Sequence, residues 1–323
     1  MSIEQSYAGK TVLVTGGAGF IGSHLTDRLV ALGARVRVLD DLSDGRADNL
    51  AGSMAAIEFR EGSITDPEAL DAVMPGCDMV FHLGANASVP RSSERPDYDF
   101  NANMAGTFQV LEAVRRHRAG RLLFASSAAV YGEPQTESGQ MGEDHPLVPK
   151  SPYGGTKLAG EFMIDAYTRC YDLDHRRVRI FNTFGPRQRK YVMFDLLEKL
   201  RRDPTRLEVI GTGDQQRDYN YVEDTATALL VVGAHPAARG RVYNIAGGRP
   251  VSIRALVDHI IELTGIPRPD IRYTMESWPG DVVRMVADTT RIGRELDYQP
   301  RVGLEAGIRH LIDWHREQFS PPW

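Results

Sequence analysis

The stretch that decides the fold reads Thr11-Val-Leu-Val-Thr-Gly-Gly-Ala-Gly-Phe-Ile-Gly22. Its first part, Thr11–Thr15, is short, apolar and β-branched, which predicts a buried parallel strand. Apolar residues then recur at helical spacing from Ile21 to Leu32, and Gly33 marks the end of a helix. A strand, a glycine-rich turn and a helix in this order indicate the beginning of a doubly wound α/β sheet.

The glycines of the turn, Gly16, Gly19 and Gly22, each meet a separate physical requirement. Gly16 permits the tight turn, Gly19 lets the backbone approach a pyrophosphate, and Gly22 lets the helix pack closely against the strand. The N–H groups and positive dipole end at the start of the helix also favour phosphate. An isolated glycine triplet is as typical of a flexible turn, but the strand before it and the helix after it favour a dinucleotide site.

An acidic pair closes the next predicted strand, Arg35–Leu39. Asp40 lies 18 residues after Gly22, and Asp41 follows it. A carboxylate at this place accepts hydrogen bonds from the adenosine ribose hydroxyls and repels a 2′-phosphate, so the pattern predicts NAD rather than NADP. Arg46 lies nearby, but a single loop arginine is usually solvated.

Strands and helices alternate through the first half of the chain, which predicts a parallel sheet covered on both faces, with right-handed crossovers. Helical periodicity runs from Pro67 to Met74 and from Asn103 to His117. We predict a Rossmann-type doubly wound NAD-binding domain over residues 1–184. The expected strands are Thr11–Thr15, Arg35–Leu39, Ile57–Arg60, Met79–Leu83, Arg121–Ser126 and Val178–Phe181.

Beyond about Gly185 the alternation loosens, which predicts a smaller C-terminal α/β substrate lobe over residues 185–323. A segment near 222–248 is expected to return to the first domain. Thr205–Gly213 and Arg268–Gly280 have the composition of loops over a cleft. The expected strands are Leu207–Ile210 and Val242–Ile245, and the expected helices are Tyr191–Arg201, Val222–Val232 and Ser252–Leu263.

Composition excludes several classes of protein. The 323 residues carry a formal net charge of −5, which does not favour nucleic acid as a partner. The two cysteines, Cys77 and Cys170, fit no metal-ligand spacing, so we expect no metal and a reducing compartment. Neither a signal-peptide core nor an apolar run of transmembrane length is found, so we expect no membrane association and a cytoplasmic enzyme.

Two further motifs carry candidate chemistry. Tyr153 and Lys157 are four residues apart, on one face of a predicted helix. A nearby ammonium and a positively charged nicotinamide would lower the tyrosine pKa and let it act as a base. Ser127 follows the fifth strand at the carboxyl edge of the sheet, where it can donate to a developing oxyanion. Each motif alone is common, but the three occur together at one sheet edge.

Together these motifs resemble the extended short-chain dehydrogenase/reductase family, specifically its NAD-dependent sugar epimerase/dehydratase group of UDP-glucose 4-epimerase-like enzymes. The resemblance covers nearly the whole chain. Its carriers are TGGAGFIG (15–22), Asp40, HLGA (82–85), Asn103 with Gly106 and Thr107, SSAAVYG (126–132), SPYGGTK (151–157), RIFNTFGPRQ (179–188), GTGDQQRDYNYVED (211–224) and GDVVRMVAD (280–288).

The resemblance implies a role for each matching residue. Tyr153 would be the base, Lys157 would orient the nicotinamide ribose, and Ser127 would bind the reacting oxygen. The implied substrate contacts are Ser88, Ser127, Tyr153, Asn182, Arg217 and Arg284, with Asn182 and the two arginines at the diphosphate. The implied cofactor contacts are Gly16, Gly19, Phe20, Ile21, Gly22, Asp40, Asp41, Ser63, Ile64, Leu83, Gly84, Ala85, Asn103, Ser126, Tyr153, Lys157 and Phe181.

The chain departs from the family pattern at two places. Relatives carry Asp-Ile where this chain has Ser63-Ile64, which leaves the adenine contact open. Family dehydratases carry Asp-Glu directly after the catalytic serine or threonine, and sugar-acid decarboxylases carry Glu at the second place. Here both places are alanine, Ala128 and Ala129. The acid/base pair for dehydration is missing, which favours epimerisation.

The resulting expectation is C4 epimerisation of a UDP-hexose or UDP-uronic acid through a transient 4-keto sugar, with NAD regenerated on the enzyme. The basic run Arg187, Arg189 and Lys190 could meet a uronate carboxylate, or be solvated. Met285 matches the family position that limits substituents at C2. The resemblance also implies a homodimer through helices near 103–117 and 153–169.

Three alternatives remain open at this point. A nucleotide-sugar dehydratase or reductase would release a keto or unsaturated sugar. A dinucleotide-sensing protein without chemistry is disfavoured because it has no need of Tyr153 and Lys157. A simple alcohol dehydrogenase is disfavoured by Asn182, Arg217 and the long second lobe.

Overall fold

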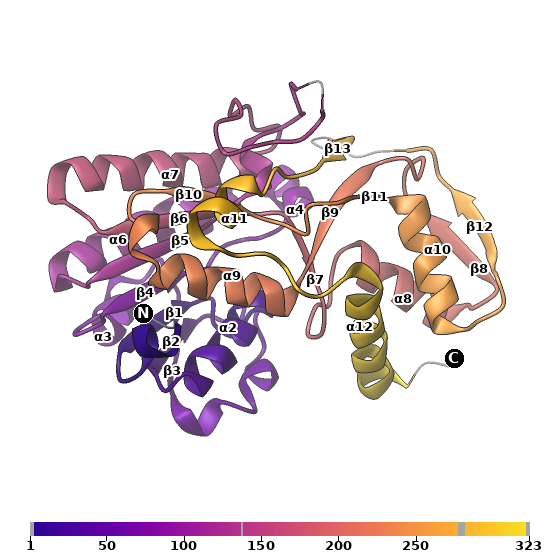
Figure 1. Ribbon diagram of the computed structural model, residues 1–323. Coiled ribbons are helices and arrows are strands. Elements are labelled where there is room, and N and C mark those ends of the chain that lie inside the picture. Colours follow the sequence, from indigo (N-terminus) through magenta and orange to yellow (C-terminus); the bar gives the residue numbers. More distant parts are fainter. Residues whose placement is uncertain (1–2, 137, 277–281, 321–323) are drawn as a thin grey trace.

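The computed structural model describes residues 3–136, 138–276 and 282–320. Figure 1 shows a large α/β body that carries the N-terminus and a smaller lobe that carries the final helix. The body is built on a parallel seven-stranded sheet in the order β10-β6-β5-β4-β1-β2-β3. Its strands are β1 (Thr11–Thr15), β2 (Arg35–Asp40), β3 (Ile57–Glu61), β4 (Met79–His82), β5 (Arg121–Ser127), β6 (His175–Ile180) and β10 (Val242–Ile245). This arrangement confirms the predicted Rossmann-type fold.

Helices cover both faces of this sheet (Figure 1). On one face lie α2 (Phe20–Ala31) and α9 (Val222–Ala234), and on the other lie α3 (Pro67–Val73), α6 (Gly106–His117) and α7 (Pro152–Tyr171). Strand β1 serves both layers, because alternate side chains point to opposite faces. Val12 and Val14 therefore join the core under α2, whereas Leu13 joins the core under α6.

The smaller lobe has a core of its own, to which α8 (Val192–Arg202), α10 (Ile253–Thr264) and α12 (Leu304–Phe319) contribute. The buried residues of α8, Met193, Leu196, Leu197 and Leu200, recur at the spacing of one helix face. The remaining strands are β7 (Asn182–Phe184), β8 (Arg206–Val209), β9 (Gln216–Tyr221), β11 (Pro250–Ser252), β12 (Asp270–Tyr273) and β13 (Arg284–Met285).

The chain crosses between the body and the lobe more than once. After β9, helix α9 packs against α2, and β10 pairs with β6 at the edge of the large sheet. The chain then returns to the lobe with β11 and α10. The boundary near residue 184 stays a prediction.

The short elements are α1 (Ile3–Tyr7), η1 (Ala47–Leu50), η2 (Met54–Ala56), α4 (Val89–Glu94), α5 (Pro96–Asp99), η3 (Phe100–Ala105), η4 (Ala128–Val130), η5 (Pro236–Ala238) and α11 (Thr290–Leu296).

The loop predicted at Arg268–Gly280 is wrong, because this segment contains β12. The strand predicted at Leu207–Ile210 is present as β8, so only the residues around it in Thr205–Gly213 are loop. The two strands pair in parallel with Asp270 opposite Arg206. Strand β12 is only four residues long and carries two charged residues, so its alternation was too short to stand out. Residues 277–280 of the second segment lie outside the described residues.

The sixth strand begins earlier than the apolar pattern predicts. It runs from His175 to Ile180 rather than from Val178 to Phe181. The hidden part carries Arg176, which is buried and pairs with Asp174. The arginines make this segment look polar in the sequence. It can nevertheless belong to the core, because the charge of Arg176 is neutralised by Asp174.

Candidate active site

The turn after β1 forms a cradle of backbone atoms. Gly16 has φ 70°, and a Cβ there would lie 2.7 Å from the backbone nitrogen of Gly84. A Cβ on Gly22 would lie 2.0 Å from the Gly16 carbonyl oxygen. Gly19 occupies the N-cap of α2 and offers no side chain to the first N–H groups, which include those of Phe20 and Ile21. Those N–H groups suit a pyrophosphate.

Asp40 ties this turn to the end of β2. Its carboxylate accepts hydrogen bonds from the backbone N–H groups of Ala18 and Leu42, each at 2.9 Å. Burial raises the pKa of Asp40, and the two backbone donors oppose the rise. The sequence argument assigned Asp40 to the ribose and missed this structural task. Asp41 is exposed and accepts from the N–H and hydroxyl of Ser43.

The loop after β4 lies against the same turn. The N–H of Gly84 donates to the Thr15 hydroxyl at 3.2 Å, so Leu83, Gly84 and Ala85 lie beside the end of β1. Ile64 is buried, and its side chain is within 3.1 Å of the place where a Cβ of Gly84 would be. The Ser63 hydroxyl interacts with that of Thr65 at 2.9 Å.

The loops after β1, β2 and β4 therefore meet at the point where strand order reverses, which is where such sheets bind ligands. The N–H groups at the start of α2 and the side-chain-free cradle of Gly16 and Gly22 fit a dinucleotide. The neighbouring acids Asp40 and Asp41 suit a ribose without a 2′-phosphate.

Helix α7 begins at the motif that carries Tyr153 and Lys157. Ser151 caps it by accepting from the Gly154 N–H, and Pro152 occupies its first turn. The Tyr153 N–H donates to the buried Ser92 hydroxyl at 3.2 Å. Lys157 lies one turn further on and donates from Nζ to the Ala125 carbonyl of β5 at 2.9 Å.

The serine of the motif lies at the end of the same strand. The Ser127 hydroxyl accepts from the Ala129 N–H at 3.2 Å and also interacts with Tyr153. The Lys157 ammonium lies 5.1 Å from the centre of the Phe124 ring. The structure thus brings Ser127, Tyr153 and Lys157 together at the carboxyl end of β5.

Two pKa shifts describe the electrostatics of this cluster. Burial raises the pKa of Tyr153, the interaction with Ser127 opposes the rise, and the Asp99 carboxylate adds to it. Burial lowers the pKa of Lys157 to about 8, and Asp99 opposes that fall. The protein groups alone therefore raise the pKa of Tyr153, whereas a base at neutral pH needs a lowered pKa. The lowering expected for a base would need a further positive charge, such as that of a bound nicotinamide ring.

Neighbouring residues support the cluster. Sequence reasoning named Asn103 as a cofactor contact and gave His82 no role of its own. His82 in β4 is buried and contacts the hydroxyls of Thr15 at 2.8 Å and Thr107 at 3.1 Å. Burial lowers the pKa of His82 to about 3, so it is neutral. Asn103 lies in the π-helical turn η3 and donates to the Asn86 carbonyl and to Asp99. A π-turn just before α6 is a signal that sequence periodicity does not carry.

The residues predicted to bind the diphosphate come from β9 and from the two strands that pair with it, β7 and β13. Asn182 lies opposite Tyr219, and Arg217 lies opposite Met285, the neighbour of Arg284. The Asn182 amide nitrogen is buried and makes no hydrogen bond within the described residues. The guanidinium of Arg217 donates to the Gln216 carbonyl at 2.9 Å, and that of Arg284 donates to the Ser138 carbonyl at 3.1 Å.

The other predicted contacts surround these strands. Phe181 is buried between β6 and β7, and Ser126 is buried at the end of β5, where it donates to Glu161. Ser88 caps the short helix α4 by accepting from the Arg91 N–H at 3.3 Å.

The basic run after β7 is engaged with protein groups. Arg187 pairs with Asp27 of α2 at 2.7 Å, and Lys190 pairs with Asp44 at 3.0 Å. Arg189 lies 5.0 Å from the Phe319 ring centre. The basic run therefore links the lobe to the large body. Because its charges already have partners, it is poorly placed to bind the carboxylate of a uronic acid. Tyr191, which sequence reasoning missed, donates its hydroxyl to the Ala87 carbonyl.

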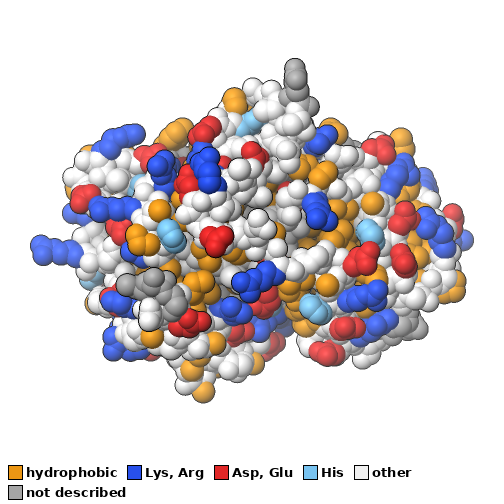
Figure 2. Space-filling model, viewed as in Figure 1, with side chains coloured by type: hydrophobic (Ala, Val, Ile, Leu, Met, Phe, Trp, Pro, Cys, Tyr) orange, Lys and Arg blue, Asp and Glu red, His pale blue; other side chains and the backbone are white. Residues whose placement is uncertain are grey.

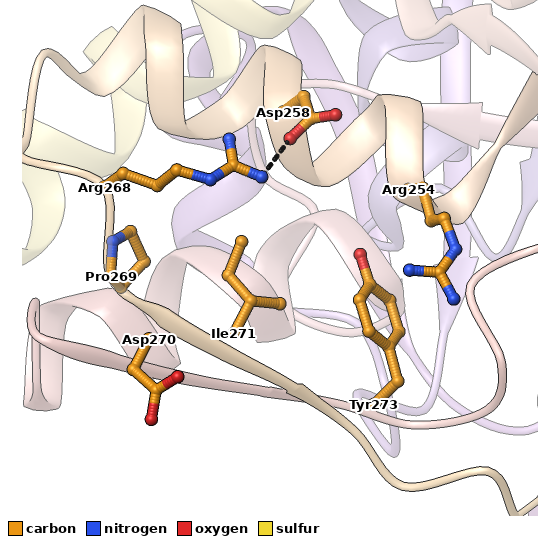
Figure 3. Close-up of a pocket in the computed structure, with 7 residues that line it drawn as sticks. All are labelled: Arg254, Asp258, Arg268, Pro269, Asp270, Ile271 and Tyr273. Atoms are coloured by element: carbon orange, nitrogen blue, oxygen red, sulfur yellow. Dashed lines mark hydrogen bonds and ion pairs between the residues drawn. The ribbon is translucent and has the colours of Figure 1, made fainter.

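A surface hollow of about 370 Å³ lies elsewhere, between α10 and β12 (Figure 3). Its two arginines are paired, Arg268 with Asp258 at 2.8 Å and Arg254 with Asp214 at 3.2 Å. It contains none of the predicted site residues. Acidic and basic side chains are interspersed over the face seen in Figure 2, so the described residues on this face form no patch of one charge.

No helix in the described part of the chain is long and apolar enough to cross a membrane. Within the same residues, no group of three or more His, Cys, Asp or Glu side chains could hold a metal ion.

The fold and this cluster define an NAD-dependent enzyme of the extended short-chain dehydrogenase/reductase type. Residues 12–246 match the model of the NAD dependent epimerase/dehydratase family, and the chain belongs to that family. It is 37% identical over 317 residues to a UDP-glucose 4-epimerase of Mycolicibacterium smegmatis, covering 95% of this chain and 98% of the relative.

Solved structures of both reaction types resemble it. A UDP-glucose 4-epimerase of Thermotoga maritima, solved with UDP-glucose, superposes with a TM-score of 0.88 at 32% identity, covering 95% of this chain and 99% of the other. A dTDP-glucose 4,6-dehydratase of Streptomyces venezuelae, solved with NAD bound, gives 0.90 at 31% identity, covering 96% and 98%. The chain is thus a nucleotide-sugar epimerase or dehydratase, and likeness alone does not choose between them.

Proposed function

We propose that this protein is a nucleotide-sugar 4-epimerase with a bound NAD. The observation that carries the proposal is the pair of alanines after Ser127. Ala128 is buried. The carbonyl oxygen of Ala129 lies against helix α7, 2.4 Å from the place where a Cβ of Gly154 would be. Neither alanine can move a proton. Eliminating water from C5 and C6 needs an acid and a base there, whereas epimerisation at C4 does not.

Two buried carboxylates of the large body, Glu161 and Glu143, are paired with other groups. Glu161 is buried and bonds to the guanidinium of Arg179 at 2.7 and 3.0 Å. Glu143 is also buried, accepts from the Asn244 N–H at 2.9 Å and lies 3.5 Å from the Arg291 guanidinium. A buried carboxylate that is already paired is a poor proton carrier. These acids therefore do not replace the missing pair.

The roles of the chain's own residues follow from their placement. Tyr153 would take the proton of the sugar 4-hydroxyl, and Ser127 would donate a hydrogen bond to the same oxygen as it becomes a ketone. Lys157, held on Ala125, would supply positive charge near the tyrosinate and a donor to the nicotinamide ribose. NAD, when bound, would accept the hydride from C4 and return it.

Inversion requires the ketone to present its other face while the nucleotide stays bound. Three residues suit this task, because they lie on the adjacent strands β7, β9 and β13 and not on α7, which carries Tyr153. They are Asn182, Arg217 and Arg284. An arginine grips phosphate oxygens through its planar fork. A grip on the diphosphate leaves the sugar able to rotate about its bonds to the phosphate.

We infer a neutral UDP-hexose as the substrate rather than a uronic acid. The basic run that could have met a carboxylate is paired with Asp27, Asp44 and aromatic rings. Relatives named UDP-glucose 4-epimerase match nearly the whole chain, which supports UDP as the nucleotide.

The direct test is to incubate the purified protein with UDP-, dTDP-, GDP- and CDP-sugars, with and without added NAD, and to follow the products by NMR. We expect a C4 epimer with no net NADH, and no conversion by Tyr153→Phe. Accumulation of a 4-keto or unsaturated sugar would make the protein a dehydratase and overturn the argument from Ala128 and Ala129.

We also propose a homodimer through η3, α6 and α7. Phe100, Phe108 and Phe162 lie on these three elements with 40–60% of their surface exposed. Apolar side chains gathered on neighbouring helices are typical of a subunit interface. Light scattering should give a dimer, and Phe108→Glu with Phe162→Glu should give a monomer. Met275→Glu, an equally exposed apolar residue in the other lobe, is the matched control and should remain dimeric.

A further inference from the structure

A buried carboxylate lies beside the catalytic helix and has no part in the mechanism above. Asp99 ends the short helix α5, directly before the π-helical turn η3, and none of its surface is exposed. Burying an ionised carboxylate is costly unless hydrogen bonds or an opposite charge compensate for the lost water. The contacts of Asp99 therefore indicate why the fold keeps it.

Three neutral donors satisfy this carboxylate. Oδ1 accepts from the amide nitrogens of Asn86 at 2.7 Å and Asn103 at 3.0 Å. Oδ2 accepts from the Thr156 hydroxyl at 2.8 Å. Within the described chain no basic side chain forms an ion pair with Asp99, so its charge is not neutralised at short range.

The donors belong to three segments that build the reaction site. Asn86 lies in the loop after β4, and Thr156 lies between Tyr153 and Lys157 on α7. The Asn103 side chain binds both backbone groups of Asn86. It accepts from the N–H at 2.8 Å and donates to the carbonyl oxygen at 3.1 Å. Asp99 therefore joins the cofactor side of the site to the helix that carries the base.

The charge of Asp99 acts on the same helix. Lys157 is buried, and the Asp99 carboxylate is the anion whose field raises its pKa against the effect of burial. The same field raises the pKa of Tyr153. The other ionisable groups around Lys157 are His82 of β4, which is neutral, and Glu161 of α7, which is paired with Arg179. Tyr191 lies within electrostatic range of both Tyr153 and Asp44.

We propose that Asp99 is a positioning residue of the active site, which fixes helix α7 through Thr156 and places a buried carboxylate among the residues that carry the chemistry. The inference rests on the oxidation at C4 that epimerases and dehydratases share. It does not depend on the choice between them.

Asp99→Asn tests the charge with little change of shape. The asparagine oxygen can still accept from Asn86 and Asn103, and its amide can donate to the Thr156 hydroxyl. The rate of C4 oxidation of UDP-glucose, or of the sugar that the NMR assay identifies, would be followed by stopped-flow absorbance at 340 nm from pH 5.5 to 9.5. Because Asp99 raises the pKa of both Tyr153 and Lys157, we expect both limbs of the pH profile to move about one unit lower. KM should change less than twofold.

Thr156→Val tests the mechanical link alone, because it removes the hydroxyl and keeps the charge. We expect a rate about tenfold lower, with both limbs of the profile in place. Unmoved limbs in a folded Asp99→Asn protein would overturn the charge role. A wild-type rate in Thr156→Val would overturn the link, and this holds even if Asp99→Asn does not fold. A wild-type protein that oxidises no sugar would instead count against the proposed function.

Discussion

The proposed cofactor side and the proposed substrate side of the site are built from different kinds of contact. On the cofactor side, backbone atoms lie against backbone atoms, as in the approach of Gly16 to Gly84 and of Gly22 to Gly16. On the substrate side, long side chains such as Arg217 and Arg284 extend from short strands. A backbone contact has no freedom to adjust, whereas a side chain has several rotatable bonds. Changes on the cofactor side should therefore act all or none, and changes on the substrate side should act by degrees.

The largest effect is expected at the tightest backbone contact. In Gly22→Ala the new Cβ would lie 2.0 Å from the Gly16 carbonyl oxygen, so the start of α2 has to move and the phosphate site is lost. NAD binding, measured by calorimetry, should fall below detection, and the sugar reaction should stop with it.

Gly155→Ala is the matched control, because a Cβ there meets no atom within 4 Å. It lies within α7, where alanine is favoured over glycine by about 1 kcal/mol, so the variant should bind NAD normally and melt no lower. A Gly22→Ala protein that binds NAD as well as this control would contradict the all-or-none view of the cofactor side.

A graded effect is expected on the substrate side. Arg217→Ala and Arg284→Ala each remove one charged donor from the predicted diphosphate contact, which is worth about 1.5–3 kcal/mol per hydrogen bond to a charged group. KM for the sugar nucleotide should rise roughly tenfold to a hundredfold, with kcat changed much less. Arg272→Ala, an exposed arginine of β12 in the same lobe, should leave both constants unchanged. Equal effects of all three variants would remove the case for a diphosphate site.

The smallest effect concerns stability on the cofactor side. His82 is buried with its pKa lowered from 6.5 to about 3, so the folded protein keeps it neutral while the unfolded chain protonates below pH 6.5. Its contribution to stability is therefore present above pH 6.5 and is lost as the pH falls toward 3. At pH 5 the loss should be about 2 kcal/mol.

Urea denaturation at pH 7, 6 and 5 measures this loss. His82→Gln keeps donors and acceptors for Thr15 and Thr107 but does not titrate, so its stability should depend less on pH over the same range. His175 and His315 also have lowered pKa values and affect both proteins alike. An identical pH dependence in the two proteins would show that His82 does not carry the effect.

Most of the large body could be predicted from the sequence, because its signals are local. The residues of β1, the glycine turn and Asp40 follow one another within thirty positions, and each residue type states its backbone requirement. The motifs SPYGGTK and SSAAVYG are likewise local, the first at the start of α7 and the second running from the end of β5 into η4. Strand and helix periodicity were sufficient to place them at one sheet edge.

The lobe was less readable for a physical reason. Strands β7, β9, β11 and β13 are only two to six residues long, so alternation has little length in which to appear. Strand β12 was predicted as a loop, and β6 began three residues earlier than its apolar pattern, because Arg176 is buried in an ion pair. Charges compensated by partners distant in the chain leave no trace in local composition.

By itself, the sequence determined the class of fold and the preference for NAD, and it singled out Ser127, Tyr153 and Lys157 as candidates, since these depend on residue types at short, regular spacings. Only the tertiary structure decided what surrounds them. It placed Asp99 between Asn86, Asn103 and Thr156, gave the basic run its acidic and aromatic partners, and buried His82 as a neutral link. Burial and electrostatic field depend on atoms brought together from distant parts of the chain, and no local pattern reports them.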